Sequence, residues 1–292
     1  MFVAPLGPVR NVMPTRTARS VLVQPIQLAK RIFRSAHFML MAKLANIKLE
    51  KSPHSFKLLR LGSTYGGWTF VDTPGLRNST VVCCGLGEDA SFDVEFATRF
   101  AATVIQVDPT PRAIAHWQAL SKNLGSKSTT SYVHGGHQPI GAYDLSDIVP
   151  GQLRLYPKAL WNETKTLRFF SPPNATHVSH SIINFQNGYR SDTAAIDVEA
   201  VTIDTVLADH SITSLDLLKI DIEGAEIEVI QDMLKRGIFP KQLLVEYDEL
   251  SVPSRKSKAR IHAAHHALLS HGYRLIHIDN PCNFLYTMLP DV

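Results

Sequence analysis

Cysteine and long apolar runs are scarce in this sequence. Its 292 residues include three cysteines, of which Cys83 and Cys84 are adjacent, and no Cys-x-x-Cys pair. Three cysteines in this arrangement make no disulfide framework, so a reducing compartment is the simplest expectation. No apolar stretch reaches the roughly 18 residues that a membrane-spanning helix needs. The sequence therefore predicts no transmembrane helix.

Acidic residues are missing from the first 49 positions, which contain eight lysines and arginines. This segment accounts for the net charge of +4, because the rest of the chain has 22 basic and 26 acidic residues. The larger part of the protein is thus mildly acidic. That balance gives little support to nucleic-acid binding, and we expect no nucleic-acid partner.

Residues 1–50 are expected to form a basic N-terminal arm ahead of one domain at 51–292. Apolar periodicity from Ser20 to Ile47 predicts a helix in this arm. Three interpretations stay open: a helix packed in front of the fold, a mitochondrial presequence, or weak contact with a membrane surface. We expect a cytoplasmic protein, with a mitochondrial or membrane-peripheral location as the alternatives.

Short apolar runs alternate with amphipathic segments in the second region. Strands are expected at Val81–Cys84, Thr103–Val107, Leu153–Leu160, Leu215–Ile220 and Leu243–Tyr247. Helices are expected at Ser91–Ala101, Pro111–Lys122, Ala225–Leu234 and His262–Ser270. This alternation predicts an α/β fold with a mostly parallel sheet and helices on both faces.

The last two expected strands, Tyr273–Ile278 and Asn283–Leu289, have no helix between them. They predict an antiparallel hairpin at the end of the sheet. A mostly parallel, seven-stranded sheet with such a terminal hairpin resembles the Rossmann-like fold of class I methyltransferases.

Residues 161–214 separate the third and fourth expected strands and are interpreted as an insertion. Insertions near strand ends commonly shape the mouth of a substrate site. His180 lies in this insertion and is therefore a candidate catalytic base. The other closely spaced histidines have no accompanying acid or cysteine in a metal-binding pattern, and we predict no metal site from them.

A glycine turn, Gly85-Leu86-Gly87, follows the first expected strand of this alternation. Glycine lets a backbone approach a ligand closely. The next strand ends at Asp108-Pro109, and Asp108 lies 23 residues after Gly85. At this spacing a carboxylate can bind the hydroxyls of a ribose. Both NAD and S-adenosylmethionine contain such a ribose.

Two acids after the turn, Glu88 and Asp89, distinguish these cofactors. They would oppose a pyrophosphate at the helix start, at a cost of roughly 1 kcal/mol or more for each close contact. S-adenosylmethionine has a cationic sulfur and an ammonium group instead. We therefore predict a site for this cofactor at Gly85, Gly87, Glu88, Asp89, Ser91, Asp108 and Pro109. The alternative is that Asp89 or Ser91 merely caps the helix.

Charged residues gather where the fourth expected strand ends. Alternation places Lys219, Asp221 and Glu223 on one side of the strand, at the edge where open α/β sheets bind ligands. Glu246, at the end of the neighbouring strand, is expected beside them. The alternative is a salt-bridged helix start, which we prefer for Glu226.

Three separated motifs resemble those of the FkbM-family methyltransferases. They are Gly85–Phe92, Val107–Pro111 and Leu217–Glu226, the last of which closely resembles the signature LLKIDVEGAE. Ser179–Ile182 is similar to an element of some members. The resemblance covers roughly residues 65–250 and makes 51–292 a methyltransferase domain. It implies S-adenosylmethionine-dependent O-methylation of a sugar, glycolipid or polyketide-type small molecule, with a small-molecule or glycan acceptor.

Such a reaction needs a group that removes the proton of the hydroxyl as it attacks. Asp221 is the favoured base, with Glu223 or Glu246 as its partner. Lys219 lies among them, and His180 is a second candidate. A divalent metal held by the carboxylates is a rival way to activate the hydroxyl. A non-catalytic, cofactor-binding relative and an NAD-dependent oxidoreductase are the alternative functions.

Overall fold

The computed structural model describes residues 56–170, 195–250, 254–279 and 282–288. The expected arm at 1–50, with its helix, lies outside these residues, as do His180 and the Ser179–Ile182 element. No helix in the described ranges is long and apolar enough to cross a membrane.

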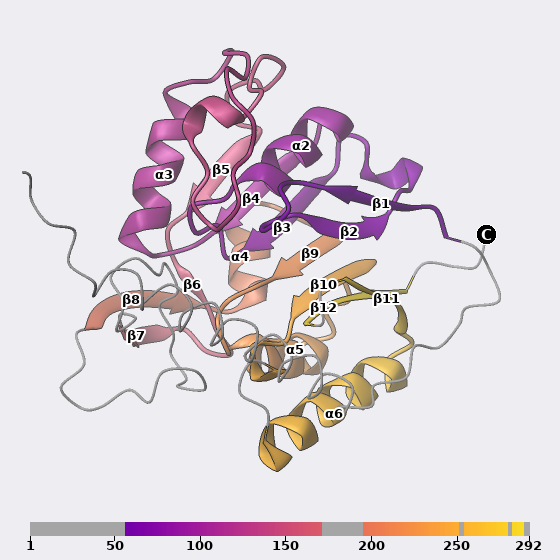
Figure 1. The fold of residues 1–292 in the computed structure, drawn as a ribbon. Coiled ribbons are helices and arrows are strands. Elements are labelled where there is room, and N and C mark those ends of the chain that lie inside the picture. Colours follow the sequence, from indigo (N-terminus) through magenta and orange to yellow (C-terminus); the bar gives the residue numbers. More distant parts are fainter. Residues whose placement is uncertain (1–55, 171–194, 251–253, 280–281, 289–292) are drawn as a thin grey trace, which may run out of the picture. The chain divides into compact units, whose positions relative to one another are not determined.

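A seven-stranded sheet with the order β11-β12-β10-β9-β3-β4-β5 forms the centre of the fold (Figure 1). Its strands are β3 (Thr80–Cys84), β4 (Thr103–Val107), β5 (Leu153–Tyr156), β9 (Leu217–Ile220), β10 (Gln242–Glu246), β11 (Arg274–Asp279) and β12 (Asn283–Thr287). The pairs from β5 through β10 are parallel, whereas β12 is antiparallel to both β10 and β11. The predicted Rossmann-like sheet with its terminal hairpin is confirmed.

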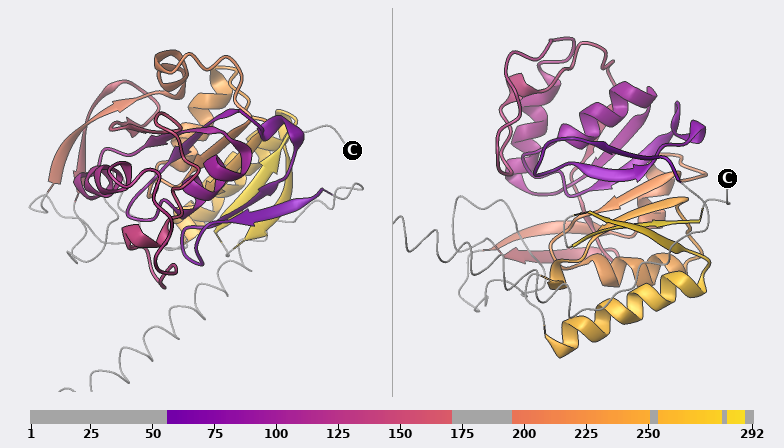
Figure 2. Two further views of the ribbon diagram at one scale, coloured as in Figure 1. Left: turned by 90° about the horizontal axis from the view of Figure 1, so that it is seen from above. Right: turned by 45° about the vertical axis from the view of Figure 1, so that its right-hand side comes forward.

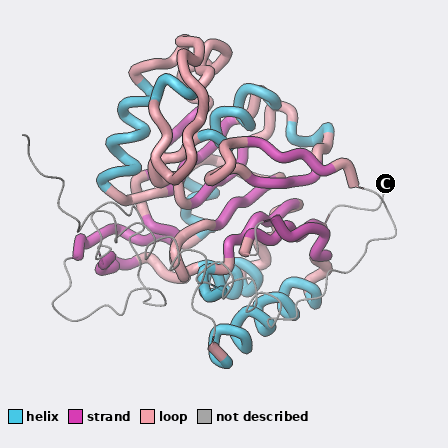
Figure 3. The backbone as a smooth tube through the Cα atoms, in the orientation of Figure 1, coloured by secondary structure: helices cyan, strands magenta, loops and turns pink. Residues whose placement is uncertain are grey.

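Helices lie on both sides of this sheet (Figures 2 and 3). They are α2 (Ser91–Phe100), α3 (Pro111–Ser121), α4 (Ile203–Asp209), α5 (Glu226–Lys235) and α6 (Arg255–Ser270). In Figure 1, α2 and α3 cover one side of the strands, and α5 and α6 cover the other. Short 3-10 helices are formed by Pro74–Leu76, Ile140–Ala142 and Asp248–Leu250.

Helix α2 packs through a row of phenylalanines spaced four residues apart. Phe92, Phe96 and Phe100 share one face of the helix, as a period of 3.6 residues requires. Their ring centroids lie 5.9, 5.3 and 5.8 Å from that of Phe70. This aromatic cluster fixes the start of α2, and with it the glycine turn that precedes the helix.

Phe70 belongs to a hairpin that the sequence pattern did not predict. Its strands are β1 (Leu58–Leu61) and β2 (Trp68–Val71), and they pair antiparallel. The side chain of Gln242 docks β2 on the main sheet, donating to the Val71 carbonyl at 2.9 Å and accepting from its N–H at 2.7 Å. The turn of the hairpin, residues 62–67, therefore has a fixed place near the glycine turn.

The third expected strand, Leu153–Leu160, was wrong in its second half. Strand β5 ends at Tyr156, because Pro157 has no N–H to continue the ladder. Beyond it, β6 (Ala159–Leu160), β7 (Lys165–Phe170) and β8 (Ala195–Val201) form a separate sheet with the order β6-β8-β7. The expected insertion at 161–214 thus contributes β7, β8 and α4 to the described fold.

Helix α6 begins seven residues before the expected start at His262. Ser254 caps it by accepting a hydrogen bond from the N–H of Ser257 at 3.0 Å. The early turns are rich in lysine and arginine, so they have no apolar stripe by which to predict a helix. The remaining expected helices and strands of the main sheet differ from the structure by at most two residues at each end.

The turn after β3 requires glycine at its first position. Gly85 has a φ of +87°, and a Cβ built there would lie 1.7 Å from the carbonyl oxygen of Asp221. Gly125 has a similar φ of +84°, but a Cβ there would have no atom within 4 Å. An alanine at either position would have a strained backbone, but only at Gly85 would its Cβ also clash with a neighbouring atom.

We predict that Gly85→Ala destabilises the fold more than Gly125→Ala. The left-handed backbone costs an alanine about 1–2 kcal/mol at either site, and overpacking at Gly85 adds roughly 1–3 kcal/mol. Urea unfolding of both variants measures the difference. Equal losses of unfolding free energy in the two variants would contradict the close approach of Gly85 to the Asp221 carbonyl.

Candidate functional site

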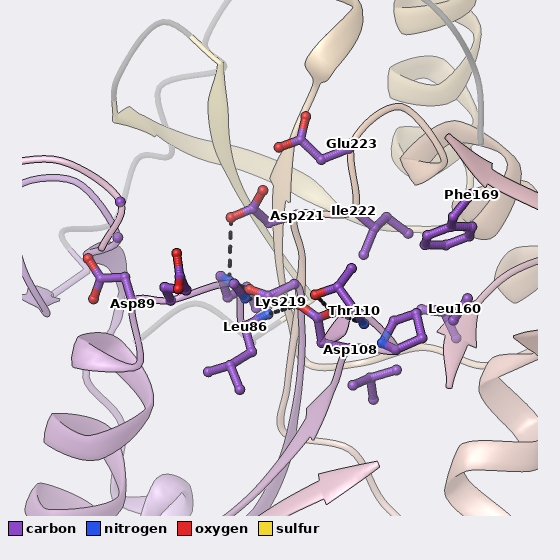
Figure 4. Close-up of a pocket in the computed structure, with 18 of the residues that line it drawn as sticks. Leu86, Asp89, Asp108, Thr110, Leu160, Phe169, Lys219, Asp221, Ile222 and Glu223 are labelled. Carbon is purple, nitrogen blue, oxygen red and sulfur yellow. Dashed lines mark hydrogen bonds and ion pairs between the residues drawn. The ribbon is translucent and has the colours of Figure 1, made fainter. Parts of the chain in front are cut away.

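A cavity opens at the carboxyl ends of β3, β4 and β9 (Figure 4). Strand order reverses at β3, which is where open α/β sheets bind their ligands. Three segments at the strand ends line it: Gly85 to Asp89 of the glycine turn, Val107 to Thr110 at the end of β4, and Lys219 with Asp221 to Glu223. The other lining residues come from separate segments and are Tyr65, Gly66, Gly136, Ala159, Leu160 and Phe169. The structure thus brings most of the predicted site residues together.

The cavity is apolar at one end and acidic at the other. Leu160 and Phe169, from β6 and β7, lie at the end opposite Asp89 in Figure 4. Asp221 and Glu223 line the cavity between these ends. The second sheet therefore supplies an apolar wall, whereas the glycine turn and the end of β9 supply negative charge.

Asp108, predicted to bind a ribose, braces the glycine turn. One carboxylate oxygen accepts from the N–H groups of Leu86 and Gly87 at 3.0 and 2.9 Å. The other accepts from the N–H and the hydroxyl of Thr110 at 2.9 and 2.7 Å. Asp108 and the neighbouring Pro109 both line the cavity. The carboxylate thus holds the turn against the end of β4, and its ribose contact stays a prediction.

Glu88 and Asp89, adjacent in sequence, have different environments. Glu88 forms an ion pair with Arg112 and lies 3.2 Å from the ring of His137. Asp89 accepts instead from neutral donors, which are the Ser91 N–H at 3.0 Å, the Ser63 hydroxyl at 2.6 Å and the Gln138 amide at 3.2 Å. Asp89 lies one residue ahead of Ala90, the N-cap of α2, yet it accepts from the first N–H of the helix and also lines the cavity. A helix-start role and a ligand contact are therefore compatible at this residue.

Ser91 is buried and does not appear among the residues that line the cavity. Its hydroxyl accepts a hydrogen bond from the Ser63 N–H at 2.7 Å. Ser91 thus has a structural role, since this bond ties the start of α2 to the β1–β2 turn, and its cofactor contact stays a prediction. No periodicity could reveal this bond, because the partners are 28 residues apart.

Lys219 is buried beneath the cavity and connects its two acidic sides. Its ammonium group donates to the Gly85 carbonyl at 2.8 Å and lies 3.4 Å from the Asp221 carboxylate. It also lies over the ring of Trp68, 5.5 Å from the centroid. Burial lowers the pKa of Lys219, but the carboxylates of Asp221 and Asp93 offset this effect and leave the pKa above its ordinary value. Lys219 is therefore a cation that positions Asp221.

The turn after β9 places Glu223 in an unusual backbone conformation. Glu223 has a φ of +56°, in the left-handed region that favours glycine. The buried carboxylate of Glu226 stabilises this turn, because it accepts from the N–H groups of Ile222 and Gly224 at 3.1 Å each. The preferred interpretation of Glu226 as part of a helix start agrees with this contact. The turn holds the Glu223 side chain at the cavity (Figure 4).

Glu246 is the last residue of β10, beside the end of β9, and is half-buried. Burial raises the pKa of its carboxyl well above the ordinary value, and the negative charges of Asp221 and Glu223 raise the pKa further. The Cys282 thiol donates to this carboxyl at 3.3 Å. Glu246 is absent from the cavity lining, and its role as a partner of Asp221 stays a prediction.

Tyr65 lines the cavity and was missed by the sequence analysis. It lies in the β1–β2 turn, and its side chain is 62% exposed. Its ring approaches Gly136 so closely that a Cβ there would lie 2.7 Å from a ring carbon. The Tyr65-Gly66-Gly67 sequence is the signal that could have identified it, since an aromatic beside two glycines in a turn is unusual for a solvent-facing loop.

In the part of the chain that the structure describes, no group of three or more histidine, cysteine, aspartate or glutamate side chains could hold a metal ion. Asp221 is paired with Lys219, and Glu246 accepts from Cys282.

We predict that Glu246→Gln makes the fold more stable at alkaline pH. A raised carboxyl pKa means that the folded protein keeps a proton that the unfolded chain releases, so stability is lost as the pH rises through the folded-state pKa. Glutamine stays neutral at every pH and still accepts from Cys282. The melting temperature of the variant should exceed that of the wild type at about pH 8. This difference should vanish near pH 4, which is about the ordinary glutamate pKa.

Glu163→Gln is the matched control for this pH series. The Glu163 side chain is 59% exposed and pairs with Lys165 at the surface, so its replacement should change stability by no more than about 0.5 kcal/mol at any pH. A Glu246→Gln variant that loses stability at alkaline pH would contradict the burial of a protonated carboxyl.

Comparison with known proteins agrees with the geometry of the cavity. Residues 65–275 match the methyltransferase FkbM domain, and this range contains the glycine turn, Asp108 and the Lys219–Glu223 strand end. A comparison with curated proteins finds no significant match. Because the matched range spans more than half of the 292 residues, the chain belongs to the FkbM methyltransferase family.

Proposed function

We propose that the protein transfers a methyl group from S-adenosylmethionine to a hydroxyl of a sugar, glycolipid or polyketide-type small molecule. The observation that carries this proposal is the polarity of the cavity. One end is apolar, with Leu160 and Phe169, the other holds the acidic Asp89, and Asp221 lines the space between them. A ligand with an uncharged aromatic base at one end and positive charge at the other complements both ends.

The residues present fit this donor. Pro109, Leu160 and Phe169 offer apolar surface to an adenine ring. Asp89 accepts from neutral donors, so its negative charge is available to an ammonium group. Asp108 already accepts four hydrogen bonds, which is about the capacity of a carboxylate. A ribose hydroxyl would bind there by replacing the hydroxyl of Thr110.

The NAD alternative is less well supported by the same cavity. The charge of Glu88 is compensated by Arg112, so the argument against a pyrophosphate rests on Asp89 and on the strand end. Asp221 and Glu223 add two carboxylates to the lining, against the single ammonium group of Lys219. A second negatively charged ligand group would be repelled here, whereas a sulfonium would be attracted.

Asp221 is the group best placed to accept the proton of the acceptor hydroxyl. It lines the cavity, and 30% of its side chain remains exposed, so an acceptor can reach it. The ammonium group of Lys219 lies 3.4 Å from this carboxylate and fixes its position. Bound S-adenosylmethionine supplies the electrophilic methyl group. Asp221 then supports attack by orienting the hydroxyl and removing its proton.

The first experiment is to measure donor binding by isothermal titration calorimetry. We expect the wild-type protein to bind S-adenosylmethionine at least about tenfold more tightly than NAD, a difference of roughly 1.4 kcal/mol. The reason is the acidic lining, which attracts a sulfonium and repels a pyrophosphate. Binding of NAD without binding of S-adenosylmethionine would refute the proposed function.

The second experiment tests Asp221 with labelled S-adenosylmethionine and a panel of glycans, glycolipids and polyketide-type alcohols. Asp221→Asn should lower turnover by about 10²–10⁴-fold, the usual contribution of a general base, while donor affinity stays within a few-fold. Asp216→Asn is the matched control, because Asp216 is also paired with a lysine, Lys241, but precedes β9 at the opposite edge of the sheet. Full activity in Asp221→Asn would exclude this residue as the base.

A further inference from the structure

Tyr65 is an aromatic residue that is both exposed and firmly held. Ser63 organises its turn, because the Ser63 hydroxyl accepts from the N–H groups of Tyr65 and Gly66 at 3.1 and 2.9 Å. The same hydroxyl donates to Asp89 at 2.6 Å. The residue as a whole is 62% exposed, so these hydrogen bonds hold the backbone of a turn whose aromatic side chain remains accessible at the cavity.

Two loops meet at the rim of the cavity around this ring. Gln138 fixes the second loop by donating to the carbonyls of Val133 and Gly135 at 3.0 and 2.9 Å, and it also donates to Asp89. Gly136 of that loop lies against the Tyr65 ring. Asp89 thus ties together both loops that position the aromatic ring.

Tyr65 lines the same cavity as Asp89 and Asp221. The neighbouring Gly66 lies so close to Asp89 that a Cβ there would be 2.7 Å from the carboxyl carbon. The ring therefore lines the acidic part of the cavity, which the glycine turn and the strand end enclose. Although the residue as a whole is 62% exposed, withdrawal of its phenol from water is the first cause that raises the pKa of Tyr65 to about 12, and the carboxylates of Asp221 and Glu223 follow. The phenol therefore stays protonated at neutral pH.

This acidic part of the cavity is where the proposed donor must carry its sulfonium. Its amino-acid end would lie at Asp89, and its methyl group must face Asp221. Aromatic rings attract such cations through their negative faces. Trp68 already has the ammonium group of Lys219 over its ring, and Phe169 lines the apolar end. Tyr65 is the aromatic lining residue at the acidic end.

We infer that the ring of Tyr65 binds the sulfonium of the methyl donor and so makes the site prefer S-adenosylmethionine over S-adenosylhomocysteine, the product whose sulfur is uncharged. This inference rests on the proposed function. The two ligands differ by one methyl group and one positive charge, so a contact with that charge is made by the donor and lost after transfer. Tyr65 would thereby help the spent cofactor to leave.

The experiment compares the affinities of wild type, Tyr65→Phe and Tyr65→Leu for both ligands by isothermal titration calorimetry. Tyr65→Phe keeps the aromatic face and should keep the ratio of the two affinities. Tyr65→Leu removes it and should weaken S-adenosylmethionine binding by roughly 3- to 30-fold, within the range of a cation–π contact, with S-adenosylhomocysteine changed by less than about twofold. Thermal unfolding checks that each variant is folded.

Phe239→Leu is the control, since Phe239 is another exposed aromatic, at 42%, and does not line the cavity. It should leave both affinities unchanged. Equal weakening of the two ligands in Tyr65→Leu would overturn the inference and leave Tyr65 a packing role. If the preference for S-adenosylmethionine over S-adenosylhomocysteine also falls in Tyr65→Phe, the inference is overturned, because the preference would then depend on the Tyr65 hydroxyl and not on the ring. Failure of the wild type to bind S-adenosylmethionine would instead refute the proposed function.

Discussion

The ammonium group of Lys219 is buried between β3 and β9, where it bonds to the Gly85 carbonyl and faces the Asp221 carboxylate. Burying a charge is costly unless partners surround it, and here a carbonyl, a carboxylate and the Trp68 ring do so. One cation thereby sets the distance between the turn that would hold the donor and the acid that would activate the acceptor. The close approach of Gly85 to the Asp221 backbone depends on the same pairing of strands.

The positions of the site residues could be predicted from sequence because their signals are local. A buried strand followed by glycine, or by alternating charges, identifies a strand end, and parallel strand ends meet at one edge of a sheet. The roles of those residues depend on distant partners. Arg112 compensates Glu88, and Ser63 and Gln138 engage Asp89. The spacing of these residues along the sequence does not indicate any of these contacts.

Tyr65 and the apolar wall were missed for a related reason. The exposure of β1 alternates weakly along four residues, too short a stretch for a period of two to stand out. Pro157 divides an apolar run into β5 and β6, which belong to different sheets. Leu160 therefore faces the cavity from a second sheet, a change of sheet that composition does not reveal.

The acidic lining has opposite consequences for stability and for the reaction. Asp221 and Glu223 place two carboxylates at one strand end, and Glu223 adds a left-handed backbone, so the site itself costs folding free energy. A ligand that brings positive charge offsets this cost, whereas a product whose sulfur is uncharged offsets it less. The protein would therefore hold the methyl donor more firmly than the spent cofactor, because the electrostatic cost of the site returns once the methyl group has left.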